Sequence, residues 1–211
     1  MRLLGVLGGE SIGCEALAAW VEASDIVVAA DAGIHHLEGI SIVPHRIVGD
    51  MDSALLVQEY DQNLITIDED EHRSDLEKLL TAAQRFGVDQ VVLICIHGGR
   101  MDHFLASFSA SIACGLNIRW VLPREHVVLL RPGFQGVFST GPAKRISLIP
   151  LEGECSVKSQ GLRWELAHTS LAVGQHVSLS NESTADAITL QVSGGHLALM
   201  VEQLPSEVPP W

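Results

Sequence analysis

The sequence is poor in basic side chains and contains no long apolar run. Its 211 residues include 13 Lys and Arg against 26 Asp and Glu, which gives a formal net charge of −13. Nonspecific nucleic-acid binding and docking on an anionic membrane both need clustered cationic side chains. No apolar run approaches the ~20 residues that a membrane-spanning helix needs. We therefore expect neither nucleic acid nor a membrane among the partners.

Cysteine pairs and the common nucleotide motifs are also missing. The chain contains no CxxC, and its cysteines are widely separated at Cys14, Cys95, Cys114 and Cys155. Residues 1–9 hold a short apolar run that is typical of a first β-strand, without the long apolar region of a signal peptide. Both features predict a cytoplasmic protein with reduced thiols. Because neither GxxxxGK[ST] nor GxGxxG occurs, a P-loop or a standard Rossmann site is not supported.

Apolar residues make up 47% of the chain, which is enough to bury a core. Over the first 124 residues, short apolar runs alternate with helical patterns, and this predicts an α/β domain with a mostly parallel sheet flanked by helices. The clearest helix covers 74–86, where Ser74 and Glu77 form a capping-box pattern. The other predicted helices cover 12–23 and 102–114, and the predicted strands are 3–7, 26–30, 46–48, 64–67, 91–96 and 118–122.

After Pro123 the pattern changes to short β-type runs separated by Gly and Pro. This predicts a C-terminal antiparallel β-sandwich-like domain, with strands at 127–130, 146–149, 177–179, 188–192 and 197–201. We expect three segments: an α/β domain (1–124), a β-rich domain (125–204) and an irregular tail (205–211).

Four aspartates follow predicted strands of the first domain: Asp31, Asp50, Asp52 and Asp75. Because ligands bind beyond the carboxyl ends of parallel strands, these side chains should gather at one edge of the sheet. Two carboxylates 4 Å apart repel by roughly 4 kcal/mol at an effective dielectric of 20, so four of them require a cation or protons. Hard oxygen ligands favour Mg²⁺. Taken alone, each aspartate also has an ordinary structural explanation. Asp50 and Asp52 are typical of a turn with a helix cap, Asp31 of a helix cap, and Asp75 of a first helical turn, where a carboxylate gains from the helix dipole.

A glycine-rich segment, His97-Gly98-Gly99-Arg100-Met101-Asp102-His103, connects a predicted strand to a predicted helix. Two glycines let backbone N–H groups approach an anion at a helix N-terminus, and Arg100 adds a fork for phosphate oxygens. Asp102 either caps the helix or contacts a nucleotide. The alternative is an ordinary loop between strand and helix.

In the β-rich region, Trp164 and the pair Ser180-Asn181 are the candidate ligand contacts. A tryptophan there is either part of the core or a platform on which an aromatic ligand stacks. Ser180-Asn181 is either a turn or a set of hydrogen-bonding groups for a ligand.

Taken in order over residues 3–201, these motifs resemble the thiamine pyrophosphokinase family. The matching stretches are Asp31-Ala32-Gly33, Gly49-Asp50-Met51-Asp52-Ser53, Ser74-Asp75-Leu76-Glu77-Lys78, Gly98-Gly99-Arg100-Met101-Asp102-His103, Ser147-Leu148-Ile149-Pro150-Leu151, Gly161-Leu162-Arg163-Trp164 and Ser180-Asn181. The chain departs from the family where Ala32 replaces a usual Gly. It departs again where His72-Arg73-Ser74-Asp75 stands for Asp-x-Thr-Asp.

The resemblance implies a homodimer with sites shared between chains. It implies transfer of a pyrophosphoryl group from ATP to the hydroxyl of thiamine with Mg²⁺, giving thiamine diphosphate and AMP. By resemblance, the metal ligands are Asp31, Asp50, Asp52 and Asp75, of which Asp50, Asp52 and Asp75 are catalytic. By the same resemblance, residues 1–124 are the catalytic domain that binds ATP and Mg²⁺, and residues 125–204 are the thiamine-binding domain. The nucleotide side comprises Gly98, Gly99, Arg100 and Asp102, and the thiamine side comprises Trp164, Ser180 and Asn181.

Three questions remain open at this point: which aspartate is the base, which molecule is the acceptor, and whether the protein is an enzyme. Either Asp50 or Asp75 accepts the proton of the attacking hydroxyl. The acceptor is thiamine or, in a related enzyme, a pterin alcohol. The third alternative is a thiamine-binding protein without turnover, which the replacement of an acid by His72 favours.

Overall fold

The computed structural model describes residues 1–50 and 60–207. The described chain forms two compact units, Met1–Pro123 and Arg124–Glu207. The boundary predicted from sequence lay between residues 124 and 125. Part of the predicted tail, residues 208–211, lies outside the described residues. No helix in the described ranges is long and apolar enough to cross a membrane.

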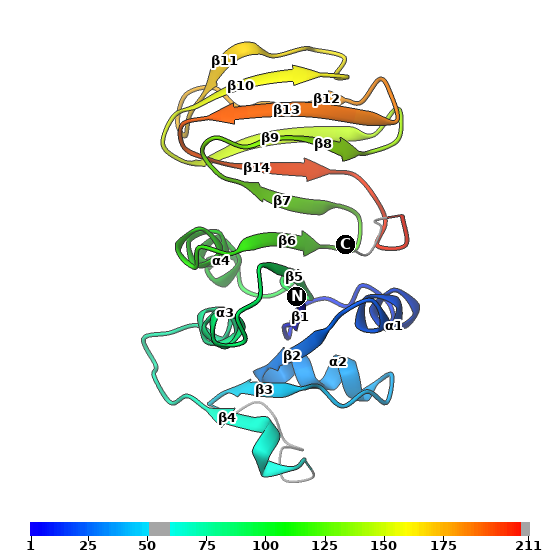
Figure 1. The fold of residues 1–211 in the computed structure, drawn as a ribbon, viewed down its shortest axis with the longest axis vertical. Helices are drawn as coiled ribbons and strands as arrows, with labels where there is room; N and C mark the ends of the chain where they lie inside the picture. The colour runs from blue at the N-terminus through cyan, green and yellow to red at the C-terminus, as the bar shows by residue number, and fades with distance from the viewer. Residues whose placement is uncertain (51–59, 208–211) are drawn as a thin grey trace. The chain divides into compact units, whose positions relative to one another are not determined.

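The first unit is built on a parallel sheet with strand order β6-β5-β1-β2-β3-β4 (Figure 1). Most of these strands are apolar on both faces because helices cover both sides. This is the architecture that the alternating pattern predicts. The strands are β1 (Arg2–Val6), β2 (Ile26–Ala30), β3 (Arg46–Gly49), β4 (Ile65–Ile67), β5 (Gln90–Ile94) and β6 (Asn117–Val121).

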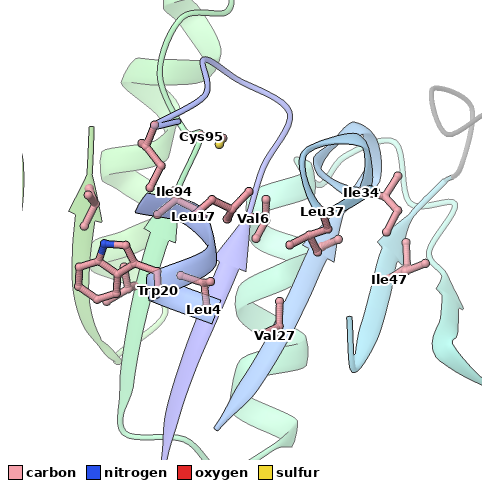
Figure 2. Close-up of a cluster of buried hydrophobic side chains, with 14 residues drawn as sticks. Leu4, Val6, Leu17, Trp20, Val27, Ile34, Leu37, Ile47, Ile94 and Cys95 are labelled. Carbon is pink, nitrogen blue, oxygen red and sulfur yellow. The ribbon is translucent and has the colours of Figure 1, made fainter. Parts of the chain in front are cut away.

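Helices α1 (Cys14–Glu22) and α2 (Ile34–Glu38) cover one face of this sheet, and α3 (Asp75–Arg85) and α4 (Met101–Ala113) cover the other (Figure 1). On the first face, Leu17 and Trp20 of α1 belong to the same buried cluster as strand residues such as Leu4 and Ile94 (Figure 2). On the opposite face, an added Cβ at Gly5 of β1 would meet the side chain of Leu79 of α3. The strand ends, and the loops that follow them, are therefore fixed from both sides.

The N-terminus of α3 carries the predicted capping box. The Ser74 hydroxyl accepts a hydrogen bond from the Glu77 N–H at 3.4 Å, and Glu77 Oε2 accepts one from the Ser74 N–H at 2.8 Å. These bonds satisfy backbone groups that have no partner within the helix. They place Asp75 as the first residue of α3.

The second unit consists of two antiparallel sheets, with strand orders β12-β9-β14-β7 and β11-β10-β13-β8. Apolar side chains from both sheets form one buried cluster that includes Leu148, Val157, Leu190 and Leu199. The predicted β-sandwich-like domain is thus present. Its strands are β7 (His126–Leu130), β8 (Gln135–Ser139), β9 (Arg145–Glu152), β10 (Cys155–Gln160), β11 (Ala167–Leu171), β12 (Ser178–Glu182), β13 (Ala187–Ser193) and β14 (His196–Val201).

Candidate active site

A pocket of about 260 Å³ lies at the carboxyl edge of the parallel sheet in the first unit. The loops after β1, β2 and β5 line it, together with the first turns of α3 and α4. This is the edge at which open α/β sheets bind ligands. The residues that line it include the charged or titratable Asp31, Asp75, Arg100 and His103, together with Gly99.

Asp31 is much more buried than Asp50 and Asp75. It is the first residue of a 3₁₀ turn (Asp31–Gly33) directly after β2, and the residue is only 6% exposed. Its φ of 43° lies in a region that residues other than glycine rarely adopt. Its buried Oδ1 has no hydrogen-bond partner among the described residues. Buried polar atoms nearly always have a partner, so this oxygen is suited to a bound cation or donor.

The loops that line the pocket pack so closely that their backbones form hydrogen bonds with one another. The Gly9 N–H donates to the Cys95 carbonyl at 2.7 Å, and the Glu10 N–H donates to the His97 carbonyl at 2.5 Å. A Cβ at Gly9 would collide with the His97 carbonyl oxygen, and one at Gly33 would collide with that of Val6. Glycine is therefore required at both positions to bring the three loops together.

Lys78 links two of the predicted aspartates. Its Nζ lies 3.8 Å from Asp50 Oδ2 and 3.9 Å from Asp75 Oδ1, and its side chain is 3% exposed. The two carboxylates are themselves partly exposed, at 41% and 44%. No sequence motif singled out Lys78, although the predicted helix places residue 78 one turn after Asp75 on the same face.

In the glycine-rich loop, Arg100 pairs with Asp102 through Nη2–Oδ2 and Nε–Oδ1 contacts of 2.5 and 3.1 Å. These bonds hold the pKa of the Asp102 carboxyl below its usual value and raise the pKa of the Arg100 guanidinium. Of the predicted nucleotide residues, Gly99 and Arg100 line the described pocket, whereas Gly98 and Asp102 do not.

Cys95 also lines the pocket. It is 2% exposed, and burial raises the pKa of its thiol to about 11. A thiol in this state is not a nucleophile at neutral pH. Phe104 and Ser107 of α4 are pocket residues that the sequence analysis did not find. Nothing in their local pattern distinguishes them from ordinary residues of a helix.

The predicted metal set is only partly described. Asp52 lies in the segment 51–59, outside the described residues. Within residues 1–50 and 60–207, no group of three or more His, Cys, Asp or Glu side chains is arranged to hold a metal ion. Asp31 and Asp75 line the same pocket, and Lys78 connects Asp75 to Asp50. The complete set therefore stays a prediction.

In the second unit, the structure places Trp164 on the connection between β10 and β11, where it is 57% exposed. It is therefore not a core residue, which removes one of its two interpretations. The guanidinium carbon of Arg163 lies 5.0 Å from the centre of its ring. Ser180 and Asn181 lie within β12 and not in a turn. The side chain of Asn181 accepts a hydrogen bond from the backbone N–H of Trp164, whereas Ser180 is exposed.

Comparison with known proteins places both units in one family. Residues 17–118 match the thiamin pyrophosphokinase catalytic domain, and residues 136–197 match the thiamin pyrophosphokinase vitamin B1 binding domain. The chain belongs to the thiamin pyrophosphokinase family. The predicted aspartates and the glycine-rich loop fall inside the catalytic-domain match of this family. Trp164, Ser180 and Asn181 fall inside its vitamin B1 binding match.

Individual relatives are distant in sequence but similar along their whole length. A thiamine pyrophosphokinase from Bacillus subtilis is 22% identical over 204 residues, which cover 92% of this chain and 95% of that protein. The crystal structure of thiamine pyrophosphokinase from Bacillus subtilis has a TM-score of 0.82 at 21% identity, covering 96% of this chain and 99% of the other. The thiamin pyrophosphokinase structure from Candida albicans has a TM-score of 0.82 at 16% identity, covering 95% and 88%.

These similarities establish the fold and agree with the family resemblance of the motifs. Membership of the thiamin pyrophosphokinase family supports ATP-dependent pyrophosphoryl transfer to thiamine. The match to a vitamin B1 binding domain favours thiamine over a pterin alcohol as the acceptor.

Proposed function

We propose that this protein transfers a pyrophosphoryl group from ATP to the hydroxyl of thiamine, giving thiamine diphosphate and AMP. The observation that carries the proposal is the pair of consecutive family matches, one to a catalytic and one to a vitamin B1 binding domain. The pocket at the carboxyl edge of the parallel sheet, most of whose lining residues fall within the first match, is the proposed site of the chemistry.

The reaction forms a bond between the thiamine oxygen and the β-phosphorus of ATP and breaks the bond from that phosphorus to the oxygen of AMP. Such a transfer depends mainly on in-line positioning and on neutralisation of phosphate charge. Arg100 and the backbone N–H groups around Gly98 and Gly99 are placed at a helix N-terminus, which suits phosphate oxygens. Either Asp50 or Asp75 accepts the proton of the hydroxyl.

We assign Mg²⁺ to the acidic set of Asp31, Asp50, Asp52 and Asp75. The buried Asp31 oxygen without a partner and the hard carboxylate donors fit this ion. When bound, Mg²⁺ neutralises phosphate charge and orients the triphosphate. The role of this chain's residues is to hold the carboxylates at one edge of the sheet.

On the thiamine side, Trp164 offers an exposed aromatic ring. Thiamine carries a positive charge on flat rings, and cations are attracted to the face of an indole. The net charge of −13 also favours a cationic substrate over an anionic one. Ser180 and Asn181 belong to the same side of the site.

We further propose that the protein is a homodimer whose sites are shared between chains, and that it works in the cytoplasm. Helix α4 supports the dimer, because Met101 and Leu105 are 69% and 60% exposed on its outer face while Ser107 and Ser111 are buried. An apolar helix face that a single chain leaves open is suited to a second copy. The cysteines, which are all free thiols, agree with a reducing compartment.

The deciding experiment is incubation of the purified protein with ATP, Mg²⁺ and thiamine. We expect thiamine diphosphate and AMP in equal amounts, and no product after addition of EDTA. A pterin alcohol offered in place of thiamine serves as the matched substrate control. Turnover of the pterin alcohol alone would establish the related enzyme instead. Thiamine binding in calorimetry without any product would establish a binding protein without turnover.

A further inference from the structure

We propose that Asn181 is a positioning residue, whose buried side chain fixes the backbone of Trp164 and does not itself contact thiamine. The inference rests on the proposed function, in which the Trp164 ring is the platform for thiamine. Asn181 and Ser180 belong to the same sequence motif, but the proposal gives them different roles.

The amide of Asn181 is engaged almost completely by backbone groups. Its Oδ1 accepts hydrogen bonds from the Trp164 N–H at 3.1 Å and from the Glu182 N–H at 2.8 Å. Its Nδ2 donates to the Trp164 carbonyl at 2.8 Å. An asparagine side chain has two acceptor sites and two donor hydrogens, so three of its four bonds are made. Since the residue is 3% exposed, almost none of its surface is available to a ligand.

The same contacts hold both backbone polar groups of Trp164. The loop around it is fixed further by Glu165, whose Oε1 accepts from the Gly161 N–H at 2.6 Å and from the Leu162 N–H at 3.0 Å. The Arg163 N–H donates to the Glu182 carbonyl at 2.8 Å. The backbone on either side of Trp164 is therefore bonded, while its ring stays exposed.

A platform that is ordered before the ligand arrives loses less conformational entropy on binding. Without Asn181, the two backbone groups of Trp164 lose their partner and the ring is no longer held in one place. The cost should then appear in thiamine binding and not in the phosphate chemistry. Ser180 differs from Asn181 because it is exposed, and its backbone N–H donates to the Ser147 hydroxyl at 3.1 Å. Its own hydroxyl remains available for a substrate contact.

The test is a double-mutant cycle between Asn181→Ala and Trp164→Ala. We expect each single variant to raise the KM for thiamine about tenfold, the scale of one aromatic–base stacking contact. The KM for ATP and the kcat at saturating thiamine should change little. If Asn181 acts only through Trp164, the double variant should be no worse than Trp164→Ala alone.

The matched control is Gln203→Ala, which removes another buried side-chain amide that donates to a backbone carbonyl, that of Thr140 at 3.0 Å. It should lower thermal stability without raising the KM for thiamine. Asn181→Asp keeps both accepted hydrogen bonds and provides a second variant if Asn181→Ala does not fold. It should show the same lack of additivity with Trp164→Ala.

A direct contact between Asn181 and thiamine would make the two penalties multiply, and that result overturns the inference. An unchanged KM for thiamine in Asn181→Ala, beside a raised one in Trp164→Ala, also overturns it. If Trp164→Ala itself leaves the KM unchanged, the platform in the proposed function fails. Amide hydrogen exchange tests the positioning role in the absence of substrate. Exchange of the Trp164 N–H should be faster in Asn181→Ala than in the original protein. An unchanged exchange rate would reject the positioning role.

Discussion

At the residue scale, Lys78 shows how one buried cation can organise an acidic site. Its side chain is 3% exposed and its Nζ lies within 4 Å of carboxylates from β3's end and from α3. Taking a charge out of water is costly unless opposite charges and hydrogen bonds compensate. Asp50 and Asp75 supply those charges, and in return the ammonium reduces the repulsion between them.

Replacement of Lys78 should therefore affect turnover. Lys78→Met keeps much of the apolar stem but removes the charge, and we expect kcat to fall about tenfold or more, as on loss of one preorganised electrostatic contact. Lys78→Arg retains the charge and is the matched control, with a smaller loss. Steady-state kinetics with varied Mg²⁺–ATP measures the effect. A normal kcat in Lys78→Met with a lowered Tm would assign the residue a structural role only.

The aspartates themselves give a second prediction at this scale. Asp50→Asn and Asp52→Asn should each reduce turnover by roughly 10²-fold, which corresponds to about 3 kcal/mol in the activation barrier. Both variants should fold, because each removes one of several like charges, and Lys78 keeps its contact with Asp75 in Asp50→Asn. Circular dichroism checks the fold and AMP release measures the rate. Near-normal rates in both variants would reject the assignment of these carboxylates.

The shared location of acidic residues at the sheet edge was easier to predict from sequence than their surroundings. Four acidic residues after strands pointed to one edge of the sheet, and the structure places Asp31 and Asp75 in one pocket there. The burial of Asp31 and its positive φ have no local signal, because they result from close packing of separate loops. The bonding of Asn181 to Trp164 spans 17 residues and depends on pairing that only the folded sheet creates.

At the scale of elements, the capping box at the start of α3 both stabilises the helix and lies next to the candidate site. Ser74 lines the pocket and its hydroxyl also donates to Glu77 Oε2 at 2.7 Å. The cap thereby fixes the first turn of the helix, which carries Asp75 and, one turn later, Lys78.

Loss of this cap should weaken both the fold and the site. Ser74→Ala should lower the free energy of unfolding by about 1 kcal/mol, the usual cost of removing a helix N-cap. Urea denaturation measures this loss. Ser74→Thr retains the hydroxyl and should stay close to the original stability. Equal stability of the alanine and threonine variants would show that Glu77 alone caps the helix.

The success of sequence patterns varied with the element. Helix α3 was predicted to within one residue at each end because capping and an apolar stripe agree. Helix α2 was missed, since its five residues are too few to show a period. Strands β8, β10 and β11 were missed because they are rich in polar residues such as Ser, Gln, Lys and His and contain few buried residues. Tertiary pairing, and not local propensity, determines such strands.

At the scale of the whole molecule, the change of pattern near Pro123 predicted the two kinds of architecture correctly. The parallel sheet follows from strand–helix alternation, and the antiparallel sheets follow from closely spaced β runs with Gly and Pro between them. The proposed dimer cannot be derived from such patterns, because a surface that a second chain would cover has no distinct sequence period. The exposed Met101 and Leu105 of α4 became visible as an open apolar face only in the structure.

Chain sharing gives the prediction that belongs to this scale. The proposed acidic set lies in Met1–Pro123, whereas the proposed thiamine platform lies in Arg124–Glu207. If each site of a two-fold dimer takes the aspartates from one chain and Trp164 from the other, Asp52→Asn and Trp164→Ala should complement each other. A mixed dimer contains one site with both defects and one with neither.

Subunit exchange at equal concentrations should restore about a quarter of the original rate, since half of the dimers are mixed and half of their sites are intact. The assay uses thiamine well below the original KM, where Trp164→Ala alone is slow. Exchange is verified with two different affinity tags, and each variant mixed with itself is the control. No recovery despite verified exchange would mean that each site lies within a single chain.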